Sequence, residues 1–250
     1  MKALLLLALL GGFVNVSGHA MYYECVGSGS PTVVLDAGSP DTSATWHWVQ
    51  PAIGKRTRVC AYDRAGLGRS APAGGHRTVI TQVDDLRHLL TAAHIPGPYI
   101  VVGHSWGGFL ARLFANRYPR ATAGVVLLDA TTFPYGAPPR TNREGIDTAD
   151  AAAKSAAIMS LGHIPLVVLG SNKPPLNAKF LDAQDAEAAL STDSVDAIAR
   201  RSTHYIQRPA PAGQPSVVIA AVDAVVTAVR RHTSLPACGR IFSRTQVTCR

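Results

Sequence analysis

The chain has 250 residues, of which 47% are hydrophobic and 16% charged, with a formal net charge of +8 at pH 7 and a pI near 9.6. This composition is typical of one folded domain and excludes a disordered or fibrous protein. The basic residues are scattered rather than interleaved with aromatic ones, so we expect no nucleic-acid partner.

The first twenty residues differ in character from the rest. Lys2 is followed by an unbroken apolar run from Ala3 to Leu10, and small residues precede Ala20. This pattern predicts a secretory signal over residues 1–20 and a secreted, cell-envelope or periplasmic protein. An uncleaved membrane anchor and an early start codon are the alternatives. Because the run is shorter than the roughly 20 residues of an ordinary span, we expect no stable membrane span after cleavage.

Short apolar runs then alternate with amphipathic ones. The runs 22–26 and 32–36, joined by a turn rich in Gly, Ser and Pro, predict a β-hairpin. We expect strands over 58–62, 99–103, 124–129 and 165–170, and helices over 79–94, 106–118 and 217–229. Apolar strands that alternate with helices predict an α/β fold, with a mostly parallel sheet covered by helices on both faces.

Two segments interrupt this alternation. Residues 131–162 are rich first in Pro and Gly and then in Ala, and they predict a small cap inserted over the sheet. Residues 174–202 are partly helical and are interpreted as surface. We therefore expect one domain over 21–232, with the cap at about 131–162, and a C-terminal tail over 233–250.

The four cysteines allow three full pairings. Cys238 and Cys249 flank the short tail, where a disulfide would hold a terminus that otherwise frays. Cys25 and Cys60 lie in strand-like segments and would either pair across strands or stay as buried thiols. No cysteine has the surrounding histidines expected of a nucleophile.

The segment Gly103-His104-Ser105-Trp106-Gly107 fits the pattern G-x-S-x-G between a predicted strand and a predicted helix. The serine of such a junction lies at the apex of a sharp turn, where side chains in place of the two glycines would collide with neighbouring backbone. The helix N-terminus also favours negative charge that develops there. We therefore predict that Ser105 is a nucleophile; a glycine-rich turn with an idle serine is the alternative.

Four segments carry a resemblance to a known family. They are Thr32–Gly38 (TVVLDAG), Tyr62–Ser70 (YDRAGLGRS), Gly103–Gly108 (GHSWGG) and His204–Ile206 (HYI), in this order. Over residues 22 to 229 the chain resembles the α/β-hydrolase fold, and within it the broad group of bacterial serine ester hydrolases. The resemblance implies a carboxylesterase-like enzyme with a catalytic triad and a small-molecule ester substrate. Neither metal-ligand spacing nor a dinucleotide motif is present, so we expect no cofactor and no metal.

The base that the resemblance implies is His204, in a loop before the C-terminal amphipathic helix. A neutral imidazole there would accept the serine proton and return it to the leaving group. The competing histidines are His163, which precedes a strand, and His232, which ends a helix on the far side. His47, between two tryptophans, and His104 are interpreted as structural.

The acid of the triad has two candidate locations. Many proteins of this fold carry an Asp after the strand that here spans 165–170, but residues 171–175 contain no carboxylate. Asp129, at the end of the preceding strand, is therefore predicted to orient the imidazole, which keeps the chain order Ser, acid, His. Asp182 and Asp185 are the alternative acids, and Asp129 would then have a capping or loop-bracing role.

Two backbone N–H groups are expected to form the oxyanion hole. One belongs to Trp106, directly after the nucleophile, and the other to Ser39, in the loop after the strand 32–36. Pro40 is excluded because it has no N–H. The family often has His-Gly where this chain has Ala37-Gly38.

Together these residues predict a monomeric serine hydrolase that cleaves ester-type bonds of small or medium acyl groups through an acyl-enzyme. A serine nucleophile argues against the dehalogenases and epoxide hydrolases of this fold, which need a carboxylate. Two alternatives remain: a non-catalytic small-molecule-binding protein on the same scaffold, and a peptidase, lactonase or thioesterase that uses the same triad.

Overall fold

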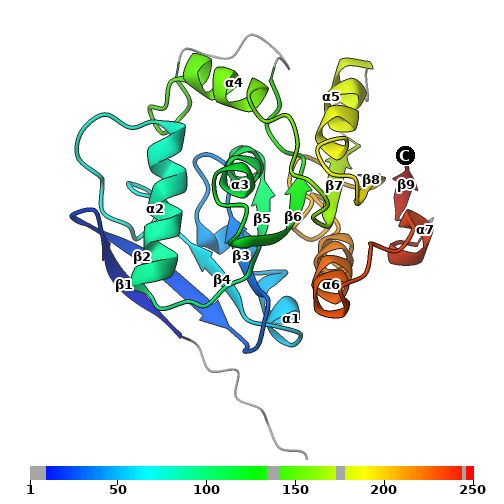
Figure 1. Ribbon diagram of the computed structural model, residues 1–250, viewed down its shortest axis with the longest axis horizontal. Coiled ribbons are helices and arrows are strands. Elements are labelled where there is room, and N and C mark those ends of the chain that lie inside the picture. Colours follow the sequence, from blue (N-terminus) through cyan, green and yellow to red (C-terminus); the bar gives the residue numbers. More distant parts are fainter. Residues whose placement is uncertain (1–9, 134–140, 173–177, 244–245) are drawn as a thin grey trace, which may run out of the picture.

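The computed structural model describes residues 10–133, 141–172, 178–243 and 246–250. These residues form a nine-stranded sheet in the order β1-β2-β4-β3-β5-β6-β7-β8-β9 (Figure 1). The strands are β1 (Leu10–Val16), β2 (His19–Val26), β3 (Thr32–Asp36), β4 (Val59–Tyr62), β5 (Tyr99–His104), β6 (Thr122–Leu128), β7 (Leu166–Ser171), β8 (Ser194–Ala199) and β9 (Val247–Cys249). Neighbours from β4 to β8 pair parallel, and β1, β2 and β9 pair antiparallel. The predicted α/β class with a mostly parallel sheet is confirmed.

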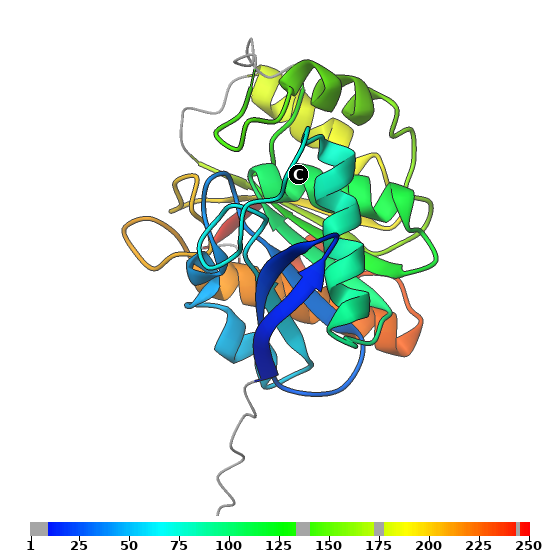
Figure 2. The same cartoon turned by 90° about the vertical axis from the view of Figure 1, so that its left-hand side faces the viewer.

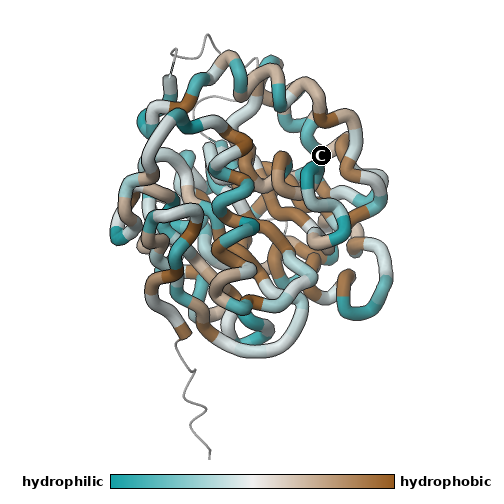
Figure 3. Tube along the Cα trace, turned by 60° about the vertical axis from the view of Figure 1, so that its left-hand side comes forward, coloured by the Kyte–Doolittle hydropathy of each residue, from teal (hydrophilic) through white to brown (hydrophobic). Residues whose placement is uncertain are grey.

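Helices cover both faces of the sheet (Figures 1 and 2). They are α1 (Gln50–Gly54, after a 3₁₀ turn over Ser43–Trp46), α2 (Val79–Ala92), α3 (Trp106–Arg117), α4 (Thr148–Ala156), α5 (Ala178–Ala188), α6 (Pro215–Arg231) and α7 (Cys238–Ile241). One hydrophobic core contains side chains of α2, α3 and α4, and the other contains side chains of α1 and α6. Hydrophobic residues accordingly gather in the interior, along the strands (Figure 3). The sheet therefore holds the carboxyl ends of β3, β5 and β6 next to one another.

The hairpin predicted over 22–26 and 32–36 is wrong. β2 and β3 both pair with β4 and not with each other. β3 is buried throughout, as a central parallel strand must be, whereas β2 alternates buried and partly exposed residues. The turn between them therefore crosses from one side of β4 to the other, and the hairpin partner of β2 is β1.

The interpretation of 174–202 as surface is wrong for β8, which is buried except for its first residue. The sequence of β8 contains Asp196, which interrupts its apolar pattern. The structure buries this carboxylate because the Gln184 side chain of α5 donates a hydrogen bond to it. A buried polar pair thus concealed a strand from pattern analysis.

β1 revises the interpretation of the first twenty residues. It pairs in register with β2 along its whole length, Val16 is buried, and Phe13 packs edge-on against Tyr22 with ring centroids 5.4 Å apart. Cleavage after Ala20 would remove this strand from the sheet, and the boundary at Ala20 stays a prediction. Residues 1–9 lie outside the described residues, and export remains a prediction.

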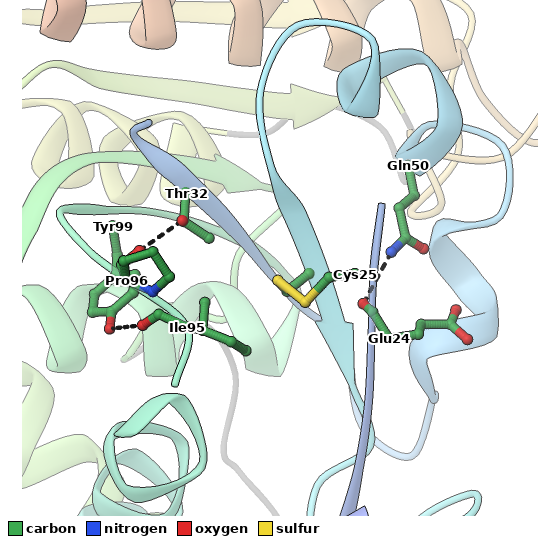
Figure 4. The surroundings of a disulfide bond; sticks show 8 residues. Glu24, Cys25, Thr32, Gln50, Ile95, Pro96 and Tyr99 are labelled. Carbon is green, nitrogen blue, oxygen red and sulfur yellow. Dashed lines mark hydrogen bonds between the residues drawn. A yellow bond between two sulfur atoms is a disulfide. The ribbon is translucent and has the colours of Figure 1, made fainter. Parts of the chain in front are cut away.

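Two disulfides are present. Cys25 and Cys60 are direct cross-strand partners on β2 and β4 and are bonded to each other (Figure 4). Cys238 is bonded to Cys249, which ties α7 to β9. This selects one of the three pairings and leaves no cysteine free. Separately, the described part of the chain contains no helix with the length and apolar character needed to cross a membrane.

Candidate active site

Ser105 lies between the end of β5 and the start of α3, so the predicted strand–turn–helix is confirmed. Its backbone has φ 53° and ψ −118°, a region that L-residues rarely occupy. A Cβ on Gly103 would lie 2.2 Å from the Gly107 carbonyl oxygen, and a Cβ on Gly107 would lie 2.2 Å from the Asp36 carbonyl oxygen. Only glycine fits at both positions, which explains the spacing of the motif.

His204 lies in the loop between β8 and α6, and its Nδ1 is 2.6 Å from Oδ2 of Asp129. Asp129 directly follows β6, and its Oδ1 accepts a hydrogen bond of 2.8 Å from the backbone N–H of Ser171. The carboxylate is buried, whereas the imidazole side chain is 44% exposed. Because Nδ1 is engaged by the carboxylate, Nε2 is the nitrogen available to exchange protons with a substrate. Within the described residues no hydrogen bond joins the Ser105 hydroxyl to His204.

The other acids and histidines considered lie elsewhere. Asp185 is on α5 and forms an ion pair of 2.9 Å with Arg250. Asp182, also on α5, lines a cavity described below. Nδ1 of His163 lies 2.8 Å from the Thr192 hydroxyl, and His232 is the C-cap of α6. Neither acid is brought to His204, so the geometry favours Asp129 as its partner.

His104 has a contact that the sequence did not reveal. Its Nε2 lies 2.7 Å from the backbone carbonyl oxygen of His204, and the centroids of the His104 and His204 rings lie 4.5 Å apart. Burial lowers the pKa of His104 to about 3, and the neighbouring His204 adds to this effect. The ring is therefore neutral, and because the carbonyl can only accept, Nε2 must carry the proton. His104 thus fixes the backbone of the loop that holds His204.

The oxyanion-hole candidates flank Ser105. Trp106 is the first residue of α3, so its N–H has no acceptor within the helix. Ser39 follows β3, in a loop beside the strand–turn–helix of residues 103–107, which we call the elbow. A Cβ on Gly38 would lie 3.2 Å from Cβ of Ser105. Among the hydrogen bonds of the described residues, neither N–H donates to another protein group. Both remain available to a ligand.

A cavity of about 500 Å³ lies between α3, α4 and α5. Arg112 and Glu187 line it and form a buried ion pair, with 3.3 Å between Nε and Oε1. The pKa of Glu187 is raised to about 7, because burial and, to a smaller extent, the Asp129 and Asp196 charges raise it by more than the Arg112 charge lowers it. Glu187 and Thr132 also line a narrow crevice that contains Asp129, so the cavity adjoins the candidate triad. Its other lining is largely apolar: Phe133, Ala156, Ile158, Ala183, Ala186 and Leu190.

Comparison with known proteins agrees with this architecture. A family model described as the α/β-hydrolase fold matches residues 31–158. The protein YqjL of Bacillus subtilis (strain 168), which is uncharacterised, is 30% identical over 206 residues, covering 74% of this chain and 81% of that protein. The chain belongs to the α/β-hydrolase family. It is accordingly a hydrolase of the α/β fold.

Solved structures of this family resemble the chain at low sequence identity and support the fold alone. A thermophilic esterase from Thermogutta terrifontis gives a TM-score of 0.68 at 21% identity, covering 88% of this chain and 99% of the esterase. A serine hydrolase involved in carbazole degradation gives a TM-score of 0.68 at 17% identity, with 88% and 99% covered. Other curated relatives are longer proteins, of which this α/β hydrolase spans 26% to 41%.

The described residues contain no group of three or more His, Cys, Asp or Glu side chains arranged to hold a metal ion.

Proposed function

We propose that this α/β hydrolase cleaves carboxylic esters through an acyl-enzyme on Ser105. The observation that carries the proposal is the hydrogen bond between His204 Nδ1 and Asp129, beside a serine at the apex of a strand–turn–helix. A carboxylate on Nδ1 fixes the imidazole tautomer with its proton on Nδ1, which leaves Nε2 free to act as a base. A serine rather than a carboxylate at the elbow favours acyl transfer over alkyl-enzyme chemistry.

In the proposed first half-reaction, Oγ of Ser105 attacks the ester carbonyl carbon while Nε2 of His204 takes the hydroxyl proton. The carbonyl π electrons move to oxygen, and the N–H groups of Ser39 and Trp106 stabilise the resulting oxyanion. As the carbonyl re-forms, the bond to the alcohol oxygen breaks and His204 gives its proton to the leaving group. Asp129 stabilises the imidazolium in between.

In the second half-reaction, water attacks the acyl-enzyme by the same route. His204 takes a proton from the water and returns it to Oγ of Ser105, releasing the carboxylic acid and the free enzyme. The serine and the imidazole must come within about 3 Å in the substrate complex, and such contacts often tighten only there.

The substrate side of the proposal follows from the cavity between α3, α4 and α5. Its volume of about 500 Å³ and its largely apolar lining suit a small or medium acyl chain. The cavity is lined by Arg112 of α3 and shares Thr132 and Glu187 with the crevice that contains Asp129. We therefore assign it to the acyl group, and the alcohol to the exposed side of His204.

We also propose that the protein works in an oxidising compartment, outside the cytoplasm. The support is the pair of disulfides, because disulfides persist mainly in such compartments. The apolar run at the start of the chain also supports export.

The test is Ser105→Ala. We expect wild-type protein to hydrolyse aryl esters of short and medium acyl chains, and the variant to lose about 10⁶ in kcat. A fluorophosphonate probe should label the wild type and leave the variant unlabelled, with equal melting temperatures for both. Folded wild-type protein that neither hydrolyses esters nor reacts with the probe would overturn the proposal. Wild-type protein that reacts with the probe and prefers aryl thioesters, lactones or peptide amides would assign the same triad to another acyl bond.

A further inference from the structure

Three charged side chains are buried together behind the candidate oxyanion hole. Arg64 follows β4, Asp36 ends β3, and Glu144 belongs to the insertion between β6 and β7. Their side chains are 4%, 1% and 4% exposed, respectively. Burying an arginine with two carboxylates costs considerable free energy of desolvation, so the contacts of the group must repay it.

Every N–H of the Arg64 guanidinium has an acceptor. Nε and Nη2 donate to the two carboxylate oxygens of Glu144 at 2.9 and 2.6 Å, a bidentate pair. Nη1 donates to Oδ1 of Asp36 and to the carbonyl oxygen of Ala37, both at 2.5 Å. Nη2 also donates to the carbonyl oxygen of Gly38 at 2.9 Å. Arg64 therefore joins the insertion on one side to the loop after β3 on the other.

The contact with Gly38 bears directly on the oxyanion hole. The Gly38 carbonyl and the Ser39 N–H belong to the same planar peptide unit, so they point in opposite directions. A hydrogen bond that holds the carbonyl toward Arg64 therefore holds the N–H away from it. The same carbonyl also accepts a hydrogen bond of 2.9 Å from the Asp41 N–H within the loop, so Arg64 is a second, charged donor that fixes the plane at a flexible glycine.

Glu144 also reaches the second donor of the hole. Its Oε2 accepts a hydrogen bond of 2.8 Å from Nε2 of Gln82, and Oε1 of Gln82 accepts one of 3.0 Å from the Trp106 indole. Burial opposes ionisation of Glu144, but the Arg64 charge and the side-chain hydrogen bonds to the carboxylate together outweigh it and lower the pKa of the carboxyl. Glu144 thus stays charged and is linked to the Gly38 carbonyl through Arg64 and to the Trp106 side chain through Gln82. The turn that presents it is held by Oδ1 of Asn142, which accepts from the N–H groups of residues 144 and 146 at 2.9 Å.

We propose that Arg64 and Glu144 are positioning residues of the oxyanion hole: Glu144 orients the Arg64 guanidinium, which in turn fixes the Gly38–Ser39 peptide plane. The insertion is thus part of the catalytic scaffold as well as a cover over the sheet. This inference rests on the proposed ester hydrolysis at Ser105. It predicts that weakening the Glu144–Arg64–Gly38 contacts lowers the stabilisation of the transition state more than the binding of the substrate.

The test compares Glu144→Gln with the control Asp85→Asn. Both substitutions neutralise a buried carboxylate paired with an arginine, but Asp85 pairs with Arg77 and has no contact with the elbow or the loop after β3. We expect Glu144→Gln to lower kcat on an aryl ester by about 10- to 100-fold with KM within about twofold. Its inhibition constant for an aryl trifluoromethyl ketone, whose adduct with serine carries the oxyanion, should rise by the same factor. Asp85→Asn should change neither quantity.

The outcomes separate this inference from the function on which it rests. If wild-type protein lacks Ser105-dependent activity, both proposals fail. If wild-type protein is active and Glu144→Gln keeps both its kcat and its ketone affinity, only the positioning role fails. If Glu144→Gln does not fold, Glu144→Asp provides the second measurement. The shorter carboxylate keeps the negative charge but cannot make the bidentate contact with Arg64, so kcat and ketone affinity should fall together by about threefold. A loss in neither would overturn the inference.

Discussion

The elbow carries Ser105 and the insertion carries Glu144, but the two regions are held in place in different ways. At the elbow, glycines let the backbones of β5, α3 and β3 approach within a distance that no Cβ would permit. In the insertion, Glu144 reaches Arg64 through a side-chain contact between residues 80 positions apart in the chain. The elbow depends on the absence of side chains, whereas the insertion depends on the presence of particular ones.

This difference explains which functional residues a sequence motif can reveal and which it cannot. Steric demands of a tight turn leave a short, fixed pattern in the chain, because every member lies within a few residues. A side-chain relay leaves isolated residues far apart, which carry no pattern until the fold brings them together. Three substitutions test this contrast between the elbow and the insertion. The first is at Asp129, which lies between β6 and the insertion.

Asp129→Asn is expected to have a larger effect than the two substitutions that follow, Gly107→Ala and Glu187→Gln. Asparagine keeps the shape of the side chain but donates where the carboxylate accepts, so the imidazole takes the wrong tautomer. We expect kcat to fall by about 10⁴ with little change in melting temperature. Steady-state kinetics on an aryl ester would measure it.

The matched controls for Asp129→Asn are Asp182→Asn and Asp185→Asn, on α5. Neither carboxylate contacts His204, so kcat should stay within about twofold of wild type. Wild-type activity in Asp129→Asn, or a loss of about 10⁴ in either control, would contradict the assignment of the acid.

Pattern analysis predicted the elements that lie near the elbow and failed where a partner lies far away in the chain. The apolar runs of β5, β6 and β7 and the amphipathic helices α2, α3 and α6 were recognised because each pattern is local. β1 was hidden because its start overlaps the apolar run, and β8 because a buried Asp196 breaks its pattern. The β2–β3 hairpin was wrong because strand order depends on contacts that no turn encodes.

The candidate site divides in the same way. Ser105 and Trp106 belong to the motif, and Asp129 was predicted by elimination among the strand ends. Nothing in the chain marked Glu144 or the contact of His104 with the His204 backbone, because each needs the folded positions of distant loops. Its charge was no signal either, because residues 131–162 also contain Arg140, Arg143, Asp147, Asp150 and Lys154.

Gly107→Ala tests the steric basis of the elbow. The new Cβ would lie 2.2 Å from the Asp36 carbonyl oxygen and 2.5 Å from that of Ala37, and backbone cannot yield as a flexible side chain can. We expect a loss of about 3 kcal/mol in the free energy of unfolding, measured in urea, together with most of the ester hydrolysis proposed for Ser105.

The comparison for Gly107→Ala is Gly162→Ala, at the end of the insertion. Gly162 has φ 74°, and a Cβ there would meet no atom within 4 Å. The cost is then confined to the left-handed backbone, about 1 kcal/mol, and activity should persist. Equal losses of stability in the two variants would show that close backbone approach does not govern the elbow.

Glu187→Gln, in the cavity beneath the insertion, should have the smallest effect, one that depends on pH. Because burial raises the pKa of Glu187 from 4.5 to about 7, the folded state favours the protonated acid. The stabilisation from this proton is complete below pH 4.5 and is lost as the pH rises through 7. Glutamine stays neutral, so relative to wild type the variant should gain on the order of 1–3 kcal/mol between pH 4.5 and pH 8. Urea unfolding at both values measures the gain, with the low-pH difference as the internal reference. A constant difference would mean that the Arg112 charge fully compensates burial and that the cavity presents an ion pair, rather than a neutral acid, to the acyl chain.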